Sequence, residues 1–166
     1  MRSTIRTHHV AFCGIMAAFA IVLGYLEHLV PLPIGIYGIK LGLANLAILS
    51  LLYLTDVKHA FVVHLLRIVV CGILFGNIFS FIYSLAGGLF SFFVMALLKR
   101  IDRFSPIGVS ICGGVAHNLA QLTAAVFLVE QLRIAFYLPV LLLAGTLAGL
   151  AVGSCSLCVI QAMKKA

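Results

Sequence analysis

Arg67 is the residue whose chemistry most needs explaining, because it stands inside an almost wholly apolar stretch that runs from His64 to Arg100. A guanidinium at bilayer depth is unfavourable by roughly 2.5–3.5 kcal/mol on insertion scales, so it must face a cavity or a partner. Its planar fork of donors suits a carboxylate or a phosphate. Two interpretations stay open: Arg67 binds an anionic ligand, or it forms a structural pair with Glu27 or with backbone carbonyls.

Further polar side chains are expected at or near membrane depth. His64 and Cys71 share a helical face with Arg67, since they stand three residues before it and four after it. A second cluster lies in the middle of the fifth predicted span and consists of His117, Asn118 and Gln121. It either reads the polar edge of a ligand or makes hydrogen bonds between helices. We predict that one cavity, open to the outside, is lined by a substrate-binding set: Glu27, Lys40, Asn45, Arg67, Asn77, His117, Asn118 and Gln121.

Two members of this set have competing interpretations. Lys40 either steers an anionic ligand or extends its ammonium to the membrane interface. Glu27 is either a proton or cation site or a counter-charge at the end of its helix. Both residues flank a segment rich in proline and glycine, which places them near the same end of the predicted bundle.

Signatures of catalysis, of metal binding and of cofactor binding are absent from the sequence. The four acidic residues are scattered, so no aspartate pair is available to hold Mg²⁺ for diphosphate chemistry. No P-loop is present. Cys155 and Cys158 have the spacing of a metal or redox pair, but no second pair accompanies them and we interpret them as small packing residues. We therefore expect no enzyme activity, no resident metal and no cofactor.

The elements that must position these residues are membrane helices. The 166-residue chain is 64% hydrophobic and 9% charged, whereas soluble domains have about 25% charged residues. Its net charge of +7 is explained by residues that flank spans, so nucleic acid is not an expected partner. The sequence predicts one all-α, polytopic membrane domain over 1–166, and its first apolar run is too long for the core of a cleaved signal peptide.

Six transmembrane helices are expected. The second is shorter than the roughly 20 residues of a full crossing, so part of the loop before it is predicted to lie at membrane depth. Pro139 is interpreted as a kink inside the last helix. The predicted spans are 10–30, 41–54, 60–75, 79–98, 107–129 and 134–160.

The basic residues predict an orientation. With a cytoplasmic N-terminus, eight of the eleven Lys and Arg residues fall on the inside, and only Lys40 and Arg133 fall on the outside. Cytoplasmic segments carry an excess of Lys and Arg. We therefore expect a multi-pass protein of the bacterial cytoplasmic membrane with both termini in the cytoplasm.

Four blocks, taken in order and spacing, carry a resemblance to a known family. They are KLGLAN at 40–45, Arg67 followed by LFGN at 74–77, SLAGG at 84–88 with Ser91 and Met95, and GVS at 108–110 leading to HNLAQ at 117–121. They resemble the bacterial Gx transporter family, also labelled heptaprenyl diphosphate synthase component I, over about Ala11 to Gly153.

That family is similar to the substrate-binding S components of energy-coupling factor transporters. The resemblance implies a six-helix bundle that takes up a small anionic or amphipathic molecule and docks on a transmembrane coupling subunit with two ATPases. It also implies docking through small residues of the first helix, here Gly14, Ala17, Ala18 and Ala20. The alternative is a non-catalytic membrane partner of isoprenoid or quinone synthesis, or of a flavin-linked electron-transfer complex.

Overall fold

A computed structural model describes residues 2–29, 42–101 and 103–165, with side chains from residue 9 onward. The described residues form helices without strands, which confirms the prediction of an all-α bundle. Five of the helices are long and apolar enough to cross a membrane. The elements are α1 (Arg2–Leu29), α2 (Leu43–Leu54), α3 (Val57–Phe75), α4 (Ile78–Ile101), α5 (Pro106–Val129), the 3₁₀ helix η1 (Leu132–Tyr137) and α6 (Leu138–Lys165).

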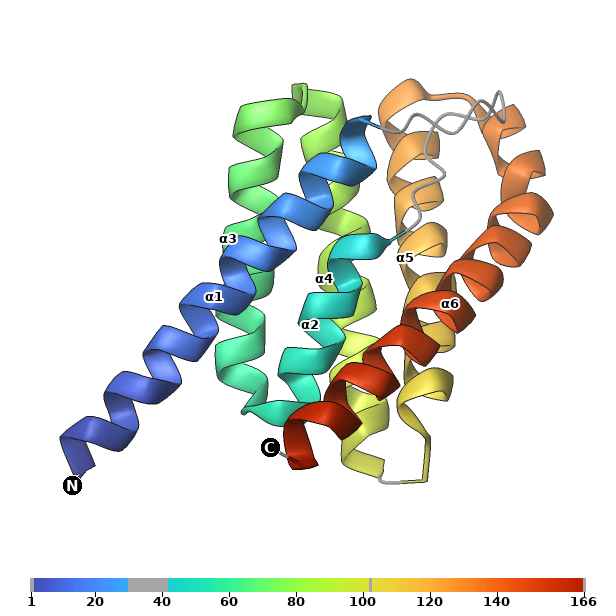
Figure 1. Cartoon of the computed structure of the whole chain (residues 1–166). Helices are drawn as coiled ribbons and strands as arrows, with labels where there is room; N and C mark the ends of the chain where they lie inside the picture. Colours follow the sequence, from blue (N-terminus) through green and yellow to red (C-terminus); the bar gives the residue numbers. More distant parts are fainter. Residues whose placement is uncertain (1, 30–41, 102, 166) are drawn as a thin grey trace.

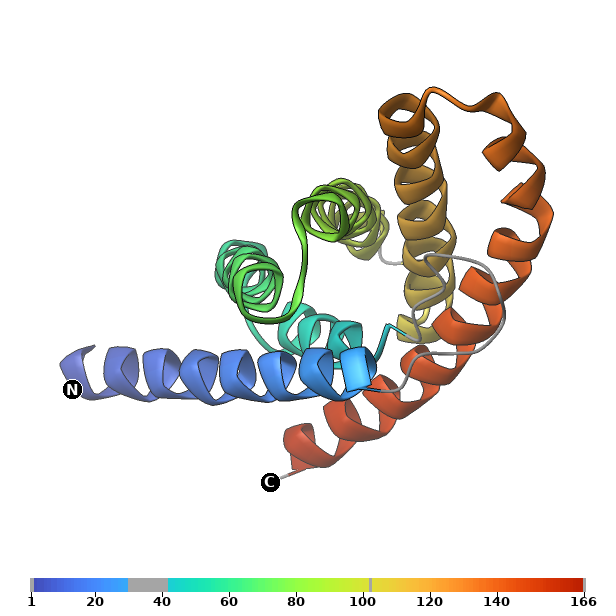
Figure 2. The same ribbon diagram turned by 90° about the horizontal axis from the view of Figure 1, so that it is seen from above.

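The long helices surround α2. Seen from above, α1, α3, α4, α5 and α6 form an incomplete ring (Figure 2), and α2 packs against α1, α3 and α6 inside it. Both termini lie at the end of the bundle that also holds the α2–α3 and α4–α5 turns (Figure 1). An even number of helices that run alternately up and down thus returns the chain to the end where it started.

The second helix is buried but short. Its side chains Ile48, Leu49, Leu51 and Leu52 are fully buried, which explains why this apolar segment is helical without facing lipid. Its 12 residues extend about 18 Å at 1.5 Å per residue, against roughly 30 Å for the hydrocarbon core. The expectation of six helices is met, although α2 alone is too short to cross, and the loop predicted to complete it lies outside the described residues.

Small residues let α5 and α6 pack closely. A methyl group added at Gly149 would lie 2.6 Å from the Cα of Ile111, and one at Gly153 would lie 2.8 Å from the Cα of Ile107. These contacts explain the Gly145, Gly149 and Gly153 repeat as a packing face, as its four-residue spacing predicts. A hydrogen bond of 2.6 Å from Asn118 Nδ2 to the carbonyl of Leu141 joins the same two helices.

Pro139 does not kink the interior of a helix. It is the second residue of α6, directly after η1, where its missing N–H removes no hydrogen bond within the helix. The expectation of an internal kink was therefore wrong. Pro106 has the same role at the start of α5, where Ser105 caps the helix by accepting a hydrogen bond of 3.2 Å from the Gly108 amide.

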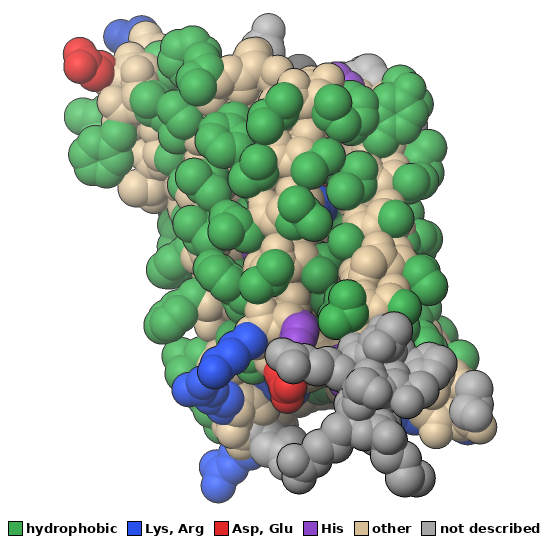
Figure 3. Space-filling model, turned by 90° about the vertical axis from the view of Figure 1, so that its left-hand side faces the viewer, with side chains coloured by type: hydrophobic (Ala, Val, Ile, Leu, Met, Phe, Trp, Pro, Cys, Tyr) green, Lys and Arg blue, Asp and Glu red, His purple; other side chains and the backbone are tan. Residues whose placement is uncertain are grey.

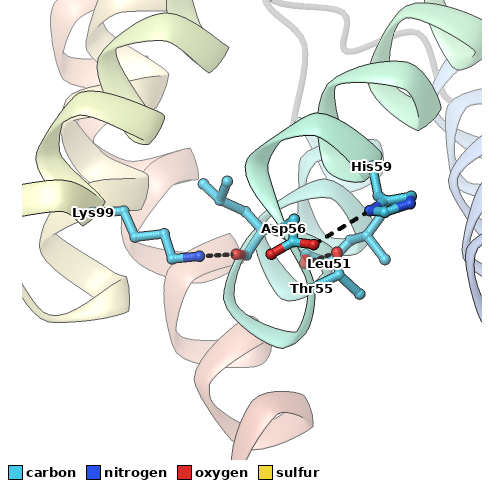
Figure 4. A network of polar contacts seen from close by, with 6 residues as sticks. Leu51, Thr55, Asp56, His59 and Lys99 are labelled. Carbon is cyan, nitrogen blue, oxygen red and sulfur yellow. Dashed lines mark hydrogen bonds and ion pairs between the residues drawn. The ribbon is translucent and has the colours of Figure 1, made fainter. Parts of the chain in front are cut away.

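The terminal end of the bundle holds a polar network (Figure 4). Lys99, near the end of α4, donates a hydrogen bond through Nζ to the carbonyl of Leu52 in the last turn of α2. Thr55 donates to the Leu51 carbonyl, and Asp56 pairs with His59 at 3.7 Å. A cation at a helix C-terminus satisfies free carbonyls and the negative end of the helix dipole. Lys99 thus connects α4 to α2.

The outer surface is apolar. In Figure 3 hydrophobic side chains cover the middle of the face shown, and most visible Lys and Arg side chains gather toward its lower end. Exposed large apolar side chains occur on every long helix, including Ile15, Ile73, Phe93, Phe127 and Leu147. A belt of this kind on a protein whose backbone bonds are satisfied within helices is what a bilayer requires.

Candidate functional site

A cavity lies in the middle of the bundle, where the short α2 leaves space between the longer helices. It has about 630 Å³ of empty space when the open solvent at its mouth is included. All six α-helices contribute to it. Its lining consists of Glu27, Gly42, Asn45, Arg67, Ser84, Met95, Ser110, Gly114, His117, Asn118, Gly145, Ala148, Gly149 and Val152.

Arg67 reaches the cavity from the middle of α3. Its Nε atom is fully buried and has no hydrogen-bond partner among the described residues. A buried donor without a partner is unfavourable, by about 1–3 kcal/mol or more for a charged group. The guanidinium therefore provides an unused donor at the cavity wall.

Glu27 faces the same cavity from the last turn of α1. Its Oε1 atom accepts a hydrogen bond from the backbone amide of Gly42, directly before α2. Its charge acts on Arg67 electrostatically, but the single ion pair within 4.0 Å found in the described part of the chain is between His59 and Asp56. Among the described residues, the cavity wall thus has one positive and one negative side chain, and these two form no ion pair within 4.0 Å.

The start of α2 forms another part of the wall. Gly42 has φ 71 and ψ 23, in the left-handed region that glycine adopts without strain. Its carbonyl accepts a hydrogen bond of 2.8 Å from the Asn45 amide. Figure 1 shows α2 starting partway along the bundle, so the N–H groups of its first turn lie beside the cavity rather than at the membrane surface.

The polar cluster predicted on α5 is divided. His117 lines the cavity and lies against Gly87 of α4, where an added methyl group would be 2.9 Å from the imidazole. Asn118 also lines it, while its amide nitrogen donates to the Leu141 carbonyl. Gln121 is buried, its Oε1 atom has no hydrogen-bond partner among the described residues, and it is not part of the lining.

Of the other predicted residues, Asn45 lines the cavity and Asn77 does not. Asn77 is exposed and accepts a hydrogen bond of 2.8 Å from the Ser80 amide through Oδ1. It therefore caps the N-terminus of α4. Lys40 lies outside the described residues. The proposed roles of all eight predicted residues stay predictions.

The three residues predicted to share a face of α3, His64, Arg67 and Cys71, do not all line the cavity. His64 is fully buried and stacks on Phe92 with ring centroids 5.4 Å apart. Cys71 packs against α1, where a methyl group at Gly24 would lie 2.9 Å from its sulfur. Arg67 alone of these three lines the cavity.

The set of predicted site residues omitted two serines of the cavity wall, Ser84 on α4 and Ser110 on α5. Hydroxyl groups inside apolar spans were the available signal, but a serine in a membrane helix more often marks close packing. Cys155 and Cys158 are both exposed, away from this wall. Across the described ranges, no three His, Cys, Asp or Glu side chains come together as metal ligands.

A comparison with known families identifies the chain. The model of the family "Heptaprenyl diphosphate synthase component I" matches residues 16–159. The chain belongs to this family. The matched range contains the whole cavity wall from Glu27 to Val152, so the resemblance found in the sequence blocks is confirmed. Searches of curated proteins and of solved structures gave no match.

Membership of the component I family makes a protein partner plausible, since the family name describes one component of a synthase. The match agrees better with the predicted role beside isoprenoid synthesis than with the predicted role in small-molecule uptake.

Proposed function

We propose that this component I protein is a non-catalytic membrane component of isoprenoid diphosphate synthesis that binds the anionic group of an amphipathic ligand in the cavity around Arg67. The observation that carries the proposal is the Arg67 guanidinium at the wall of a cavity, whose buried Nε donor has no partner among the described residues. A charge in that position is tolerated only with a partner. A ligand anion supplies one, since no carboxylate among the described residues contacts Arg67.

The family name supports the class of ligand. Heptaprenyl diphosphate has a charged diphosphate head and an apolar chain, so it is an amphipathic anion. Arg67 alone predicts an anionic ligand, and the resemblance implies an anionic or amphipathic one. A guanidinium binds phosphate oxygens through two parallel N–H donors. The exposed belt of apolar side chains supports a position of the cavity within the bilayer, where an isoprenoid chain is soluble.

The distribution of acidic residues supports a role without catalysis. Glu27 is at the end of α1, Asp56 precedes α3 and Glu130 ends α5, so these carboxylates lie on different parts of the bundle. Magnesium-dependent diphosphate chemistry uses carboxylates that converge on the metal. We propose that a separate protein supplies the catalytic site.

The proposed placement is the bacterial cytoplasmic membrane, with both termini in the cytoplasm. Lys58, Lys99, Arg100, Lys164 and Lys165 are near the end of the bundle that holds both termini, whereas Arg133 is in η1 at the opposite end. The excess of basic residues supports the cytoplasmic side for the terminal end.

The test measures binding of isopentenyl diphosphate to the purified protein in detergent, with isopentenol as the neutral control. Arg67→Gln should lose about 2–5 kcal/mol of binding free energy, the range for truncating one partner of a buried charge pair. Arg67→Lys should restore little, because an ammonium lacks the planar fork. The matched control is Arg100→Gln, an exposed arginine at the end of α4. A folded Arg67→Gln variant with unchanged affinity would refute the proposal.

Uptake as an S component is a second candidate, favoured by one feature of α1. Nothing lies within 4 Å of a methyl group placed on Gly14 and Ala18 is exposed, whereas Ala17 and Ala20 of the predicted docking face are buried in the core. Gly14 and Ala18 are therefore the part of that face that is open to a partner helix. We propose Gly14→Leu as its test: the variant should lose co-purification with a co-expressed energy-coupling module. If the unaltered protein retains no such module, the uptake candidate is rejected.

A further inference from the structure

The N-terminus of α2 lies at the cavity that Arg67 lines. Gly42 and Asn45, on either side of the first residues of this helix, both belong to the cavity wall. The first N–H groups of a helix have no carbonyl partner within the helix, and together they amount to a partial positive charge. This end of α2 and Arg67 are therefore two positive elements at one cavity.

The Glu27 carboxylate already lies at the N-terminus of α2. The Glu27 carboxylate accepts the Gly42 amide hydrogen bond and acts electrostatically on Arg67. It leaves the Nε donor of Arg67 without a partner. The carboxylate thus satisfies the helix end while the guanidinium remains open to a second anion.

The position of α2 strengthens the electrostatic interaction of its N-terminus with an anion. Because its 12 residues start partway along the bundle, its positive end lies at the cavity wall, where Gly42, Leu43 and Asn45 are each partly buried. Electrostatic interactions are several times stronger there than in water. Short helices whose N-termini end at membrane depth bind anionic groups of substrates for this reason.

We propose that Glu27 is a built-in substitute for the ligand. In this proposal a phosphate or diphosphate group binds between the Arg67 guanidinium and the first turn of α2, and it displaces the Glu27 carboxylate from the Gly42 amide. The proposal deepens the proposed function and rests on it. It assigns the N-terminus of α2 as the second half of the anion site and Glu27 as its internal competitor.

A structural consequence follows from the hydrogen bond that would break. Glu27 is in the last turn of α1, and its bond to Gly42 joins α1 to α2. Two anions at one helix end repel each other, so a bound phosphate group and an ionised Glu27 exclude one another. Ligand binding thus releases the C-terminal end of α1 from α2.

The first experiment measures the affinity of inorganic diphosphate for the full chain in detergent. Glu27→Gln keeps a side-chain acceptor for the Gly42 amide and removes the competing charge. It should bind diphosphate more tightly by on the order of tenfold, the effect of removing one like charge near a partly screened site. The control Glu130→Gln removes the same charge from an exposed helix end and should change the affinity less than twofold. Weaker or unchanged binding by Glu27→Gln would overturn the proposal.

The second experiment uses the unaltered protein, so it does not depend on the folding of a variant. Hydrogen exchange followed by mass spectrometry should show slower exchange at 42–47 and faster exchange at 24–29 when diphosphate is added. Unchanged exchange at either segment would overturn the proposal.

The failure of this inference differs from failure of the proposed function. If diphosphate does not bind, or if Arg67→Gln binds it as well as the unaltered protein does, both the proposed function and the role of Glu27 are refuted. If binding depends on Arg67 but Glu27→Gln does not strengthen it, only the role of Glu27 as an internal competitor is refuted.

Discussion

Replacing Gly149 by alanine should destabilise the bundle, although alanine is the better helix former. A methyl group there would lie 2.6 Å from the Cα of Ile111, 2.8 Å from the carbonyl oxygen of Ser110 and 3.0 Å from the amide nitrogen of Ile111. All three neighbours are backbone atoms of α5, so no side chain can rotate away. The two helices must separate, which also disturbs the cavity wall that Gly149 lines.

The magnitude follows from two opposing terms. Overpacking a close contact lowers the free energy of unfolding by about 1–3 kcal/mol, and the gain in helix propensity returns at most about 1 kcal/mol. For a chain of this size we expect an apparent melting temperature lower by roughly 2–8 °C. The assay is thermal unfolding in detergent at a fixed heating rate, because membrane proteins often unfold irreversibly.

The matched control is Gly14→Ala in α1, where nothing lies within 4 Å of the added methyl group. This variant has the same chemical change without the contact, so its melting temperature should stay constant or rise. Equal melting temperatures for the two variants would refute the close packing of α5 against α6 as the structure describes it.

Two other predictions concern the terminal end of the bundle. Lys99→Met removes the cation that donates to the Leu52 carbonyl and should lower the unfolding free energy by about 1 kcal/mol. The control is Lys164→Met, at an exposed position. Equal stability of the two variants would argue against Lys99 as a cap of α2. Single cysteines placed at Lys58, Ser105 and Lys165 in a cysteine-free background should all react from the cytoplasmic side only. Labelling of any of the three from outside would contradict the proposed orientation.

Most helix boundaries were predictable because glycine, proline and capping residues interrupt the apolar runs. Gly76 and Asn77 separate α3 from α4, and Ser105 with Pro106 starts α5. The helices extend beyond the predicted spans at three polar ends, since α1 starts at Arg2, α4 ends at Ile101 and α6 ends at Lys165. Hydropathy detects the part of a helix inside the bilayer, whereas backbone hydrogen bonds continue into the polar interface.

The site was less predictable than the fold. Helical periodicity correctly places His64, Arg67 and Cys71 along one side of α3, but these residues are spread over roughly 10 Å of helix. They consequently meet α4, the cavity and α1 respectively. The contact from Glu27 to Gly42 joins residues 15 positions apart, and no local pattern indicates it. The cap formed by Asn77 could have been predicted, since asparagine before a helix is a typical N-cap.

The burial of α2 also has a consequence for how the chain is made. One of the helices that cover α2 is α6. A hydrogen bond of 3.3 Å from Ser156 Oγ of α6 to the Leu46 carbonyl of α2 joins residues 110 positions apart. During synthesis α2 leaves the ribosome well before α6. The nascent chain must therefore hold a helix too short to span the bilayer, with one side uncovered, until α6 has been inserted. A chain that is terminated before α6 leaves that side of its second helix without a protein neighbour.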